Sequence, residues 1–255
     1  MIQLLNGEKW DEQELLAKMD DDIFYYGHLG KHALSSSSIK LLQSSPKKYH
    51  YVTQYGNEES QALRDGWLFH TSILEPDVFN SQIFVDVQSK NTKKYKEALA
   101  EHGKVFTMKE KSDAERLADA FLKNEQALQL ITDCDFEVPA VGIIDDLPLR
   151  GKADVLGKHG IVDLKTTTDI RAFPYSAKKY GYDIQAYIYC QLFNVPYTEF
   201  KFIVLDKGTL DIAIYDVSEQ FYFDGERKTL ESIERYKMFF IENADLNSYT
   251  LRGTL

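Results

Sequence analysis

Three stretches in the second half of the chain carry the hydrophobic pattern of β-strands. Residues 136–144 alternate between apolar and polar positions, and residues 149–156 and 160–167 are short, apolar and rich in β-branched side chains. The turn-forming pair Asp145-Asp146 and the run 157–160 separate them. The pattern therefore predicts an antiparallel meander of three strands.

Helical spacing surrounds this meander on both sides. A short helix is expected after Leu34, where a serine run supplies the N-cap and Ser45-Pro46 ends the helix. Longer apolar repeats at helical spacing predict helices over 61–74, 109–131, 173–193 (interrupted at Gly181) and 221–241. Residues 199–205 and 209–217 read as two further strands joined by a hairpin turn at 206–208.

This order of elements indicates an α/β (α+β) fold, with a mixed central sheet flanked by helices and an N-terminal helical portion packed on it. We expect a single domain over 1–255. Within it, 1–33 form an accessory N-terminal segment, 34–130 are mainly helical, and 131–255 form the sheet core.

Composition narrows the class of protein. The 255 residues include 44% hydrophobic ones, enough for a substantial core, while the longest apolar runs are far too short for a membrane helix. The acidic N-terminus does not resemble a secretion signal. Cys134 and Cys190 are the only cysteines, which suggests a reducing cytoplasm and leaves too few thiolates for an iron–sulfur cluster.

The net charge of −10 argues weakly against binding nucleic acid by bulk attraction. Basic residues nevertheless cluster at 47–48, 90–96, 104–111 and 178–179. Either these clusters are solvated helix faces, or some of them line a locally basic groove on an otherwise acidic protein. Charge alone leaves both interpretations open.

The meander carries a candidate chemical site at Asp154, Asp163 and Lys165. Asp163 and Lys165 are two residues apart on one strand and so share a face, while Val162 and Leu164 point into the core. The turn at 157–160 folds Asp154 back toward Asp163. Two carboxylates on one sheet surface repel each other unless a divalent cation lies between them. The set suits metal-assisted phosphodiester hydrolysis, and the alternative is a salt-bridged surface hairpin.

Two helices add polar residues at a spacing of four. Gly66 and His70 share one helix face, where the glycine would let another backbone approach and the imidazole could bind metal; the alternative for His70 is a hydrogen-bonded core histidine. Gln185 and Tyr189 form the second pair. They would contact a phosphate or base near the metal, or would simply form a stripe facing solvent.

The same residues carry a family resemblance. The run 151–154 (Gly-Lys-Ala-Asp), followed by 161–167 (Ile-Val-Asp-Leu-Lys-Thr-Thr), resembles the core motif of the PD-(D/E)XK nuclease superfamily. Segments 34–46, 66–76 and 180–189 are similar to further blocks of its exodeoxyribonuclease VIII (RecE-type) branch from phages and prophages. The four blocks occur in the expected order, and the resemblance implies a restriction-endonuclease-like core.

The resemblance also implies roles. It assigns metal binding to His70, Asp154, Asp163 and the backbone carbonyl of Leu164, action on the attacking water to Lys165, and completion of the site to Gln185 and Tyr189. Glu137 is similar to a recurrent glutamate on the first core strand. The second acidic position is aspartate here, where many members of the superfamily have glutamate, so the exact position of the metal is left open.

The activity implied is Mg²⁺-dependent degradation of one strand of linear double-stranded DNA from 5′ to 3′, with Mn²⁺ able to substitute. The branch implies a ring-shaped homo-oligomer that cooperates with a single-strand annealing recombinase in the bacterial cytoplasm. Three alternatives remain: a RecB-like nuclease of other polarity or single-strand substrate, an inactive DNA-binding or assembly subunit, and a structural phage protein. The chain has no phosphate-binding Gly-x-x-x-x-Gly-Lys-Ser/Thr loop, so any helicase motor would be a separate chain.

Overall fold

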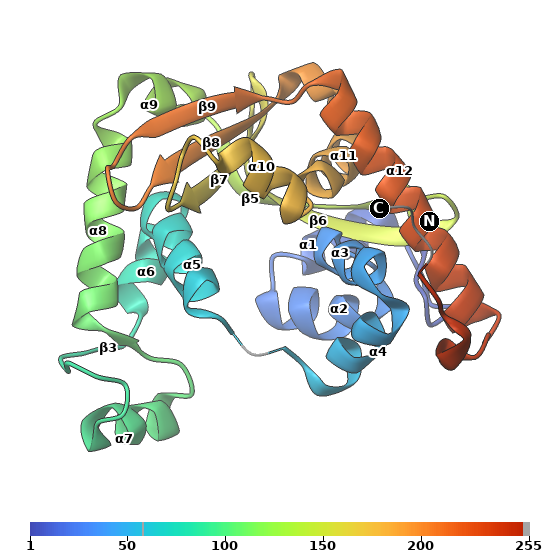
Figure 1. The fold of residues 1–255 in the computed structure, drawn as a ribbon, viewed down its shortest axis with the longest axis horizontal. Coiled ribbons are helices and arrows are strands. Elements are labelled where there is room, and N and C mark those ends of the chain that lie inside the picture. The colour runs from blue at the N-terminus through green and yellow to red at the C-terminus, as the bar shows by residue number, and fades with distance from the viewer. Residues whose placement is uncertain (58, 252–255) are drawn as a thin grey trace.

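A five-stranded mixed sheet forms the centre of the molecule (Figure 1). The computed structural model describes residues 1–57 and 59–251. The sheet order is β5-β6-β7-β8-β9. Its strands are β5 (Asp135–Ile144), β6 (Leu147–Gly157), β7 (Gly160–Thr167), β8 (Phe200–Asp206) and β9 (Ile212–Asp216). The predicted fold class, a mixed sheet flanked by helices, is confirmed.

Strands β5, β6 and β7 form the antiparallel meander that the hydrophobic pattern predicts. Strand β8 then pairs in parallel with β7, and β9 returns antiparallel to β8. The parallel pair requires a long crossover, which is supplied by α10 (Phe173–Lys179) and α11 (Tyr182–Phe193). Gly181 separates these two helices in the left-handed backbone conformation, at φ +66°, as its interruption of the helical pattern suggested.

Helices cover both faces of the sheet. On one side α3 (Ser36–Ser44), α11 and α12 (Glu219–Tyr236) pack on the sheet, and on the other side α5 (Gln61–Leu74), α8 (Met108–Leu122) and α9 (Glu125–Ile131) do so. Strand β7 is therefore covered on both sides, with Ile161 facing the first group and Val162 and Leu164 facing the second. A polar side chain on this strand lies in the interior rather than on a surface hairpin.

Most predicted helices are present, with three differences in extent. The helix expected over 109–131 is two helices, because Asn124 caps a new one by accepting a hydrogen bond from the backbone N–H of Ala127. The serine run caps α3 through Ser35, and Ser45-Pro46 ends it as expected but also begins α4 (Pro46–Tyr55). The final predicted helix continues from α12 into a π-helical turn over Lys237–Ile241.

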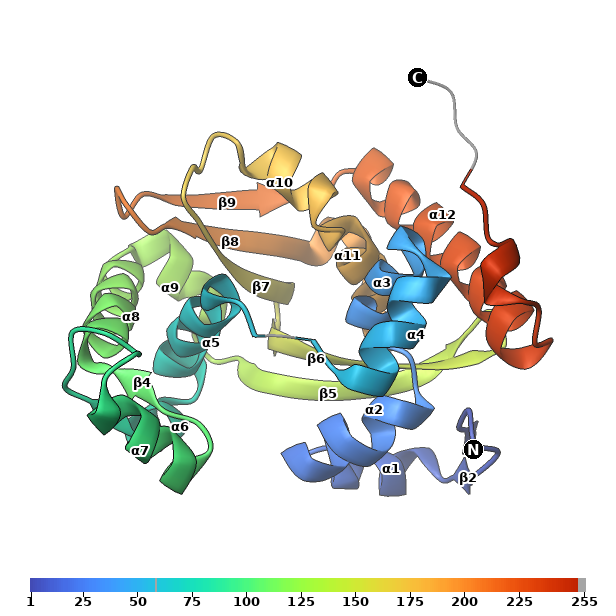
Figure 2. The same cartoon turned by 60° about the horizontal axis from the view of Figure 1, so that its bottom comes forward.

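The first 33 residues pack against the β5–β6 hairpin, below it in Figure 2. They contain β1 (Ile2–Gln3), β2 (Lys9–Trp10), α1 (Glu12–Lys18), a π-helical turn over Ile23–His28 and α2 (Leu29–His32). Their apolar side chains enclose Val141 of β5, and the ring of Tyr25 covers the guanidinium of Arg150 on β6 at 4.3 Å. This segment is thus part of the packed molecule.

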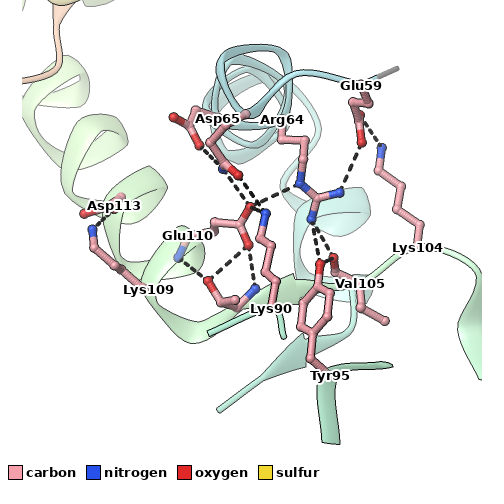
Figure 3. A network of polar contacts seen from close by, with 12 residues as sticks. Glu59, Arg64, Asp65, Lys90, Tyr95, Lys104, Val105, Lys109, Glu110 and Asp113 are labelled. Carbon is pink, nitrogen blue, oxygen red and sulfur yellow. Dashed lines mark hydrogen bonds and ion pairs between the residues drawn. The ribbon is translucent and has the colours of Figure 1, made fainter. Parts of the chain in front are cut away.

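An arm between α5 and α8 holds elements that the sequence pattern did not reveal. They are α6 (Pro76–Ser81), the parallel pair β3 (Phe84–Val85) and β4 (Phe106–Thr107), and α7 (Lys93–His102). Figure 3 shows the polar network that joins this arm to α5 and α8. Glu110 of α8 is buried at its centre and accepts hydrogen bonds from Arg64 and Lys90.

Arg64 completes the network by donating to the carbonyl of Val105 at 2.6 Å and to Glu59 at 3.1 Å. Burial opposes ionisation of Glu110, but hydrogen bonds from Gln61 and Lys90 outweigh it and lower its pKa to about 2. The network therefore fixes the N-terminal half of α5 to the arm.

Within the described residues, no helix combines the length and the apolar character needed to span a membrane.

Candidate active site

The site lies where strands β6 and β7 stop pairing. Their ladder ends at Val155 opposite Val162, and continuing that register would set Asp154 directly opposite Asp163. Instead of a backbone pair, the Asp154 carboxylate accepts a hydrogen bond from the N–H of Leu164 at 2.8 Å. The two aspartates that were predicted to lie across the ladder from each other are thus brought to the same point of the sheet.

The neighbouring strand is also interrupted at this point. Phe136 pairs with Val155 and Val138 pairs with Ala153, but Glu137 and Asp154 between them do not form a backbone pair. Glu137 has φ +50°, a left-handed conformation that costs a non-glycine residue on the order of 1–3 kcal/mol. Such strain persists only when the surrounding structure holds the backbone in place. Here the strained residue is the one whose carboxylate lies beside Asp154.

Helix α5 adds a histidine to these carboxylates. The Nδ1 atom of His70 lies 3.3 Å from Oδ2 of Asp154. His70, Glu137 and Asp154 each offer one ligand atom, and these three atoms all lie within 4.8 Å of one another. Imidazole and carboxylate groups at such separations can share one divalent cation.

The electrostatics of Glu137 support a cation at this place. Burial, and then repulsion from the carboxylates of Asp154 and Glu75, raises the pKa of Glu137 to about 8. A divalent cation among these groups would remove that repulsion and favour the ionised carboxylate. The residues present therefore fit a metal of the hard, oxygen-binding type.

Asp163 lies beside this group in a second polar cluster. It is completely buried, its Oδ1 accepts a hydrogen bond from Nε2 of Gln185 at 2.6 Å, and its Oδ2 forms an ion pair with Lys165. Burial raises the pKa of Asp163 despite the nearby Lys165 ammonium. The Asp163–Lys165 pair is thus interior, which contradicts the alternative of a salt-bridged hairpin on the surface.

Lys165 remains a cation in this setting. Burial lowers its pKa, but the charges of Asp163 and Asp154 outweigh burial and raise the pKa above its ordinary value. The ammonium also lies 4.9 Å from the centre of the Tyr182 ring, close enough for a cation–π interaction. Lys165 can therefore donate hydrogen bonds or attract negative charge, but an ammonium cannot accept a proton.

Gln185 and Tyr189 face the interior, so the alternative of a solvent-facing stripe is wrong. Burial raises the pKa of Tyr189 well above its usual value, while a hydrogen bond with Gln185 acts against the rise. The Tyr189 ring packs under β6, where a Cβ atom at Gly151 would come within 2.9 Å of it. Tyr189 thereby supports Gln185, and Gln185 holds Asp163.

The family of the chain follows from this motif and from its match to known proteins. A family model described as "PDDEXK-like domain of unknown function (DUF3799)" matches residues 35–244. The chain belongs to this PDDEXK-like family. All the site residues described above fall within the matched range. The Asp-x-Lys part of the family's name corresponds here to Asp163, Leu164 and Lys165, on strand β7.

A solved structure shares the overall fold of this chain. A crystal structure of a protein named "Putative exonuclease" from Eubacterium rectale covers 98% of this chain and 97% of its own, with 15% identity and a TM-score of 0.65. A structure of a protein named SSO0001 aligns with 86% of this chain and 84% of its own, at 13% identity and a TM-score of 0.37. No curated protein matches the chain.

The surroundings of Gly66 and Leu164 in this PDDEXK-like site differ in how far they match the sequence-based expectations. Among the described residues, no other segment comes within 4 Å of where a Cβ would stand at Gly66, so the close backbone approach expected there is wrong. The amide of Leu164 contacts Asp154, which brings the backbone of Leu164 to the site; metal binding by its carbonyl stays a prediction.

The sequence pattern by itself also missed the place of Glu137 beside His70 and Asp154. Only the family resemblance singled Glu137 out, since a left-handed glutamate inside a strand leaves no periodic signal. The aromatic ring under Lys165 was likewise not foreseen. Tyr182 directly follows Gly181, the glycine between α10 and α11, and an aromatic residue placed at such a helix start was the available clue.

Proposed function

We propose that the protein is a metal-dependent exodeoxyribonuclease that acts on the ends of linear double-stranded DNA. The observation that carries the proposal is the meeting of His70, Glu137 and Asp154, three potential metal ligands, beside the buried pair Asp163–Lys165. A metal site next to a fixed ammonium is suited to phosphodiester hydrolysis. Membership of the PDDEXK-like family and the fold shared with the E. rectale protein support the same reaction class.

In the proposed site His70, Asp154 and Asp163 hold Mg²⁺, or Mn²⁺ in its place, with the Leu164 carbonyl as a further ligand. Glu137 adds a carboxylate from the facing strand. The bound ion would lower the pKa of a coordinated water and neutralise charge that builds on the phosphate.

The protein's own groups then orient the reaction. Lys165 is an ammonium held by Asp163, so it donates to the attacking water or to a phosphate oxygen and stabilises developing negative charge. Gln185 fixes the carboxylate of Asp163 and so sets the position of Lys165. Tyr189 packs under β6 and forms a hydrogen bond with Gln185. The resemblance further suggests that Gln185 and Tyr189 act near the scissile strand.

We further propose that the protein belongs to the exodeoxyribonuclease VIII (RecE-type) branch. Its activity would then be 5′ to 3′ degradation of one DNA strand, which leaves single-stranded tails for phage-type homologous recombination in the bacterial cytoplasm. The corresponding partners are a ring of identical subunits and a single-strand annealing recombinase. A ring would reconcile the net charge of −10 with DNA binding, because only its inner surface need be basic.

Digestion of a duplex labelled at one 5′ or one 3′ end tests the proposal. With Mg²⁺ we expect stepwise loss of nucleotides from the 5′ end, no release in EDTA, and binding without hydrolysis in Ca²⁺. Shortening from the 3′ end, or preference for single strands, would replace the branch assignment with a RecB-like nuclease. DNA binding with no release under any metal would replace the enzyme with a binding subunit.

A further inference from the structure

A second lysine reaches the site from a different part of the chain. Lys40 lies on α3, whose apolar residues Ile39 and Leu42 are completely buried against the sheet. Its side chain extends across the start of α11 at Gly181. A Cβ atom at Gly181 would lie 3.1 Å from Cγ of Lys40 and 3.5 Å from its Cε. Gly181 therefore has two functions: it adopts φ +66°, and it leaves room for this lysine.

The two lysines share one aromatic ring. Nζ of Lys40 lies 5.1 Å from the centre of the Tyr182 ring, and Nζ of Lys165 lies 4.9 Å from the same point. The ring offers both ammonium groups a partial, weak compensation for the water that they have lost. Two like charges near one ring also repel each other.

The nearby carboxylates are engaged elsewhere. The charged groups that act on Lys40 are Lys165, Asp163 and Asp183, and Asp163 is paired with Lys165 while Asp183 is paired with Lys228. Among residues 1–57 and 59–251, Lys40 has no carboxylate oxygen within ion-pair distance. Burial, and then repulsion from Lys165, lowers the pKa of Lys40 to about 8.

Lys40 is only partly exposed, and a cation in such a place without an anionic partner is costly unless a ligand supplies the anion. We propose that Lys40 binds a phosphate group of the DNA strand that enters the site, so that Lys40 and Lys165 together clamp the backbone around the scissile bond. The inference rests on the proposed function and adds to it a substrate contact on α3. A phosphate oxygen between the ammonium groups would replace their repulsion with two charge-assisted hydrogen bonds.

A purely structural role would give a different result. In that case the aliphatic stem of Lys40 would matter because it packs over Gly181 and Tyr182, and the charge would not. Methionine has a similar length and can fill the same space without a charge, while arginine keeps the charge. Lys40→Met and Lys40→Arg therefore separate packing from phosphate binding.

The test measures binding of a fluorescent duplex in Ca²⁺ at several salt concentrations, and its cleavage in Mg²⁺. For Lys40→Met we expect affinity to fall about tenfold, and the slope of log affinity against log salt to become shallower by about one. Lys40→Arg should recover most of the affinity. Lys123→Met is the control: it removes an exposed charge at the residue that follows α8, and its DNA binding should resemble that of wild type.

Thermal unfolding of the same variants distinguishes the outcomes. The melting temperature of Lys40→Met should stay the same or rise, because a repelling buried charge is lost. Unchanged affinity and salt slope in Lys40→Met, with wild type still cleaving DNA, would overturn the role of Lys40 alone. A fall in melting temperature that Lys40→Arg shares would also overturn it, in favour of packing. Absence of DNA binding by wild type would overturn the proposed function itself.

Discussion

Buried charge is concentrated at a few residues around the point where β6 and β7 stop pairing. Asp163 and Lys165 form an interior ion pair, and Glu137, Asp154 and His70 meet beside it. Each carboxylate there raises the cost of ionising the next. These buried charges therefore lower the stability of the folded protein. Such a cost is expected at a site that binds a metal ion and DNA.

Asp163→Asn tests the link between the ion pair and turnover. Asparagine keeps the shape of the side chain but removes the charge that holds Lys165 and that, in the proposed site, would help to bind the metal. We expect the cleavage rate to fall at least about 100-fold, while circular dichroism shows a folded protein. The rate is measured by release of labelled nucleotide, and cleavage within threefold of wild type would remove Asp163 from the mechanism.

The raised pKa of Glu137 should make the stability of the metal-free protein depend on pH. Its pKa is about 8 in the folded state, above its ordinary value of 4.5. The protonated form is therefore favoured by folding, so this contribution is complete below pH 4.5 and is lost as pH rises through 8. After solvent screening, the loss should be roughly 2–4 kcal/mol.

The measurement is urea unfolding in EDTA from pH 5 to pH 9 for wild type and Glu137→Gln. The free energy of unfolding of wild type should fall relative to that of the variant as pH rises. Excess Mg²⁺ should cancel much of the difference above pH 8, because the cation favours the ionised carboxylate. Parallel curves for the two proteins in EDTA would show that Glu137 ionises freely and is not held among other carboxylates.

Residue spacing predicted part of this site for physical reasons. Strand alternation set Asp163 and Lys165 on one face, and the turn at 157–160 brought Asp154 back toward Asp163. The same reasoning left open a salt-bridged hairpin on the surface, and that alternative is wrong because helices distant in sequence cover both faces of the sheet. The strained backbone of Glu137 is a product of tertiary packing and has no local signature.

At the scale of elements, α5 connects the site with the arm. Its C-terminal half carries His70 to Asp154, and its N-terminal half is tied to Glu110 through Gln61 and Arg64 (Figure 3). Because α5 is one rigid helix, the contacts at its N-terminal half help to determine the position of His70 in its C-terminal half. The Glu110 network thus contributes to the geometry of the site without touching it.

Glu110→Ala should therefore destabilise the protein and leave the cations Arg64 and Lys90 without their buried partner. We expect a loss of about 3–5 kcal/mol in the free energy of unfolding. Lys109→Ala is the matched control, since Lys109 is the adjacent residue and forms an exposed pair with Asp113 in the same helix; its effect should be below about 1 kcal/mol. Equal effects of the two substitutions in urea unfolding would contradict a structural role for the network.

The boundaries of elements were harder to predict than their existence. The apolar repeat continues through 109–131 because Phe121 and Ala127 both face the same core, yet the chain breaks at Asn124, whose side chain caps α9. Periodicity reports which face is buried and not whether the helix is continuous. The short strands β3 and β4 have two residues each and are too short to leave any pattern.

At the scale of the whole molecule, a net charge of −10 is compatible with Lys40 and Lys165 standing ready for a phosphate at the site, because charge is distributed unevenly. Segments far apart in sequence contribute to one place: Lys40 from α3, His70 from α5, Glu137 from β5, Asp154 from β6, and Asp163 and Lys165 from β7. Folding of the complete sheet with its covering helices is needed to assemble them. A local motif alone would not form this site.

The most direct test of the central claim is a crystal structure of the protein soaked in Mn²⁺, with anomalous scattering recorded at the manganese edge. We expect a peak coordinated by His70 and Asp154, with carboxylate oxygens of Glu137 or Asp163 in the same shell. The peak should vanish in Asp154→Ala crystals treated in the same way. An ordered His70–Asp154 contact with no manganese beside it, or manganese bound only elsewhere, would contradict the account.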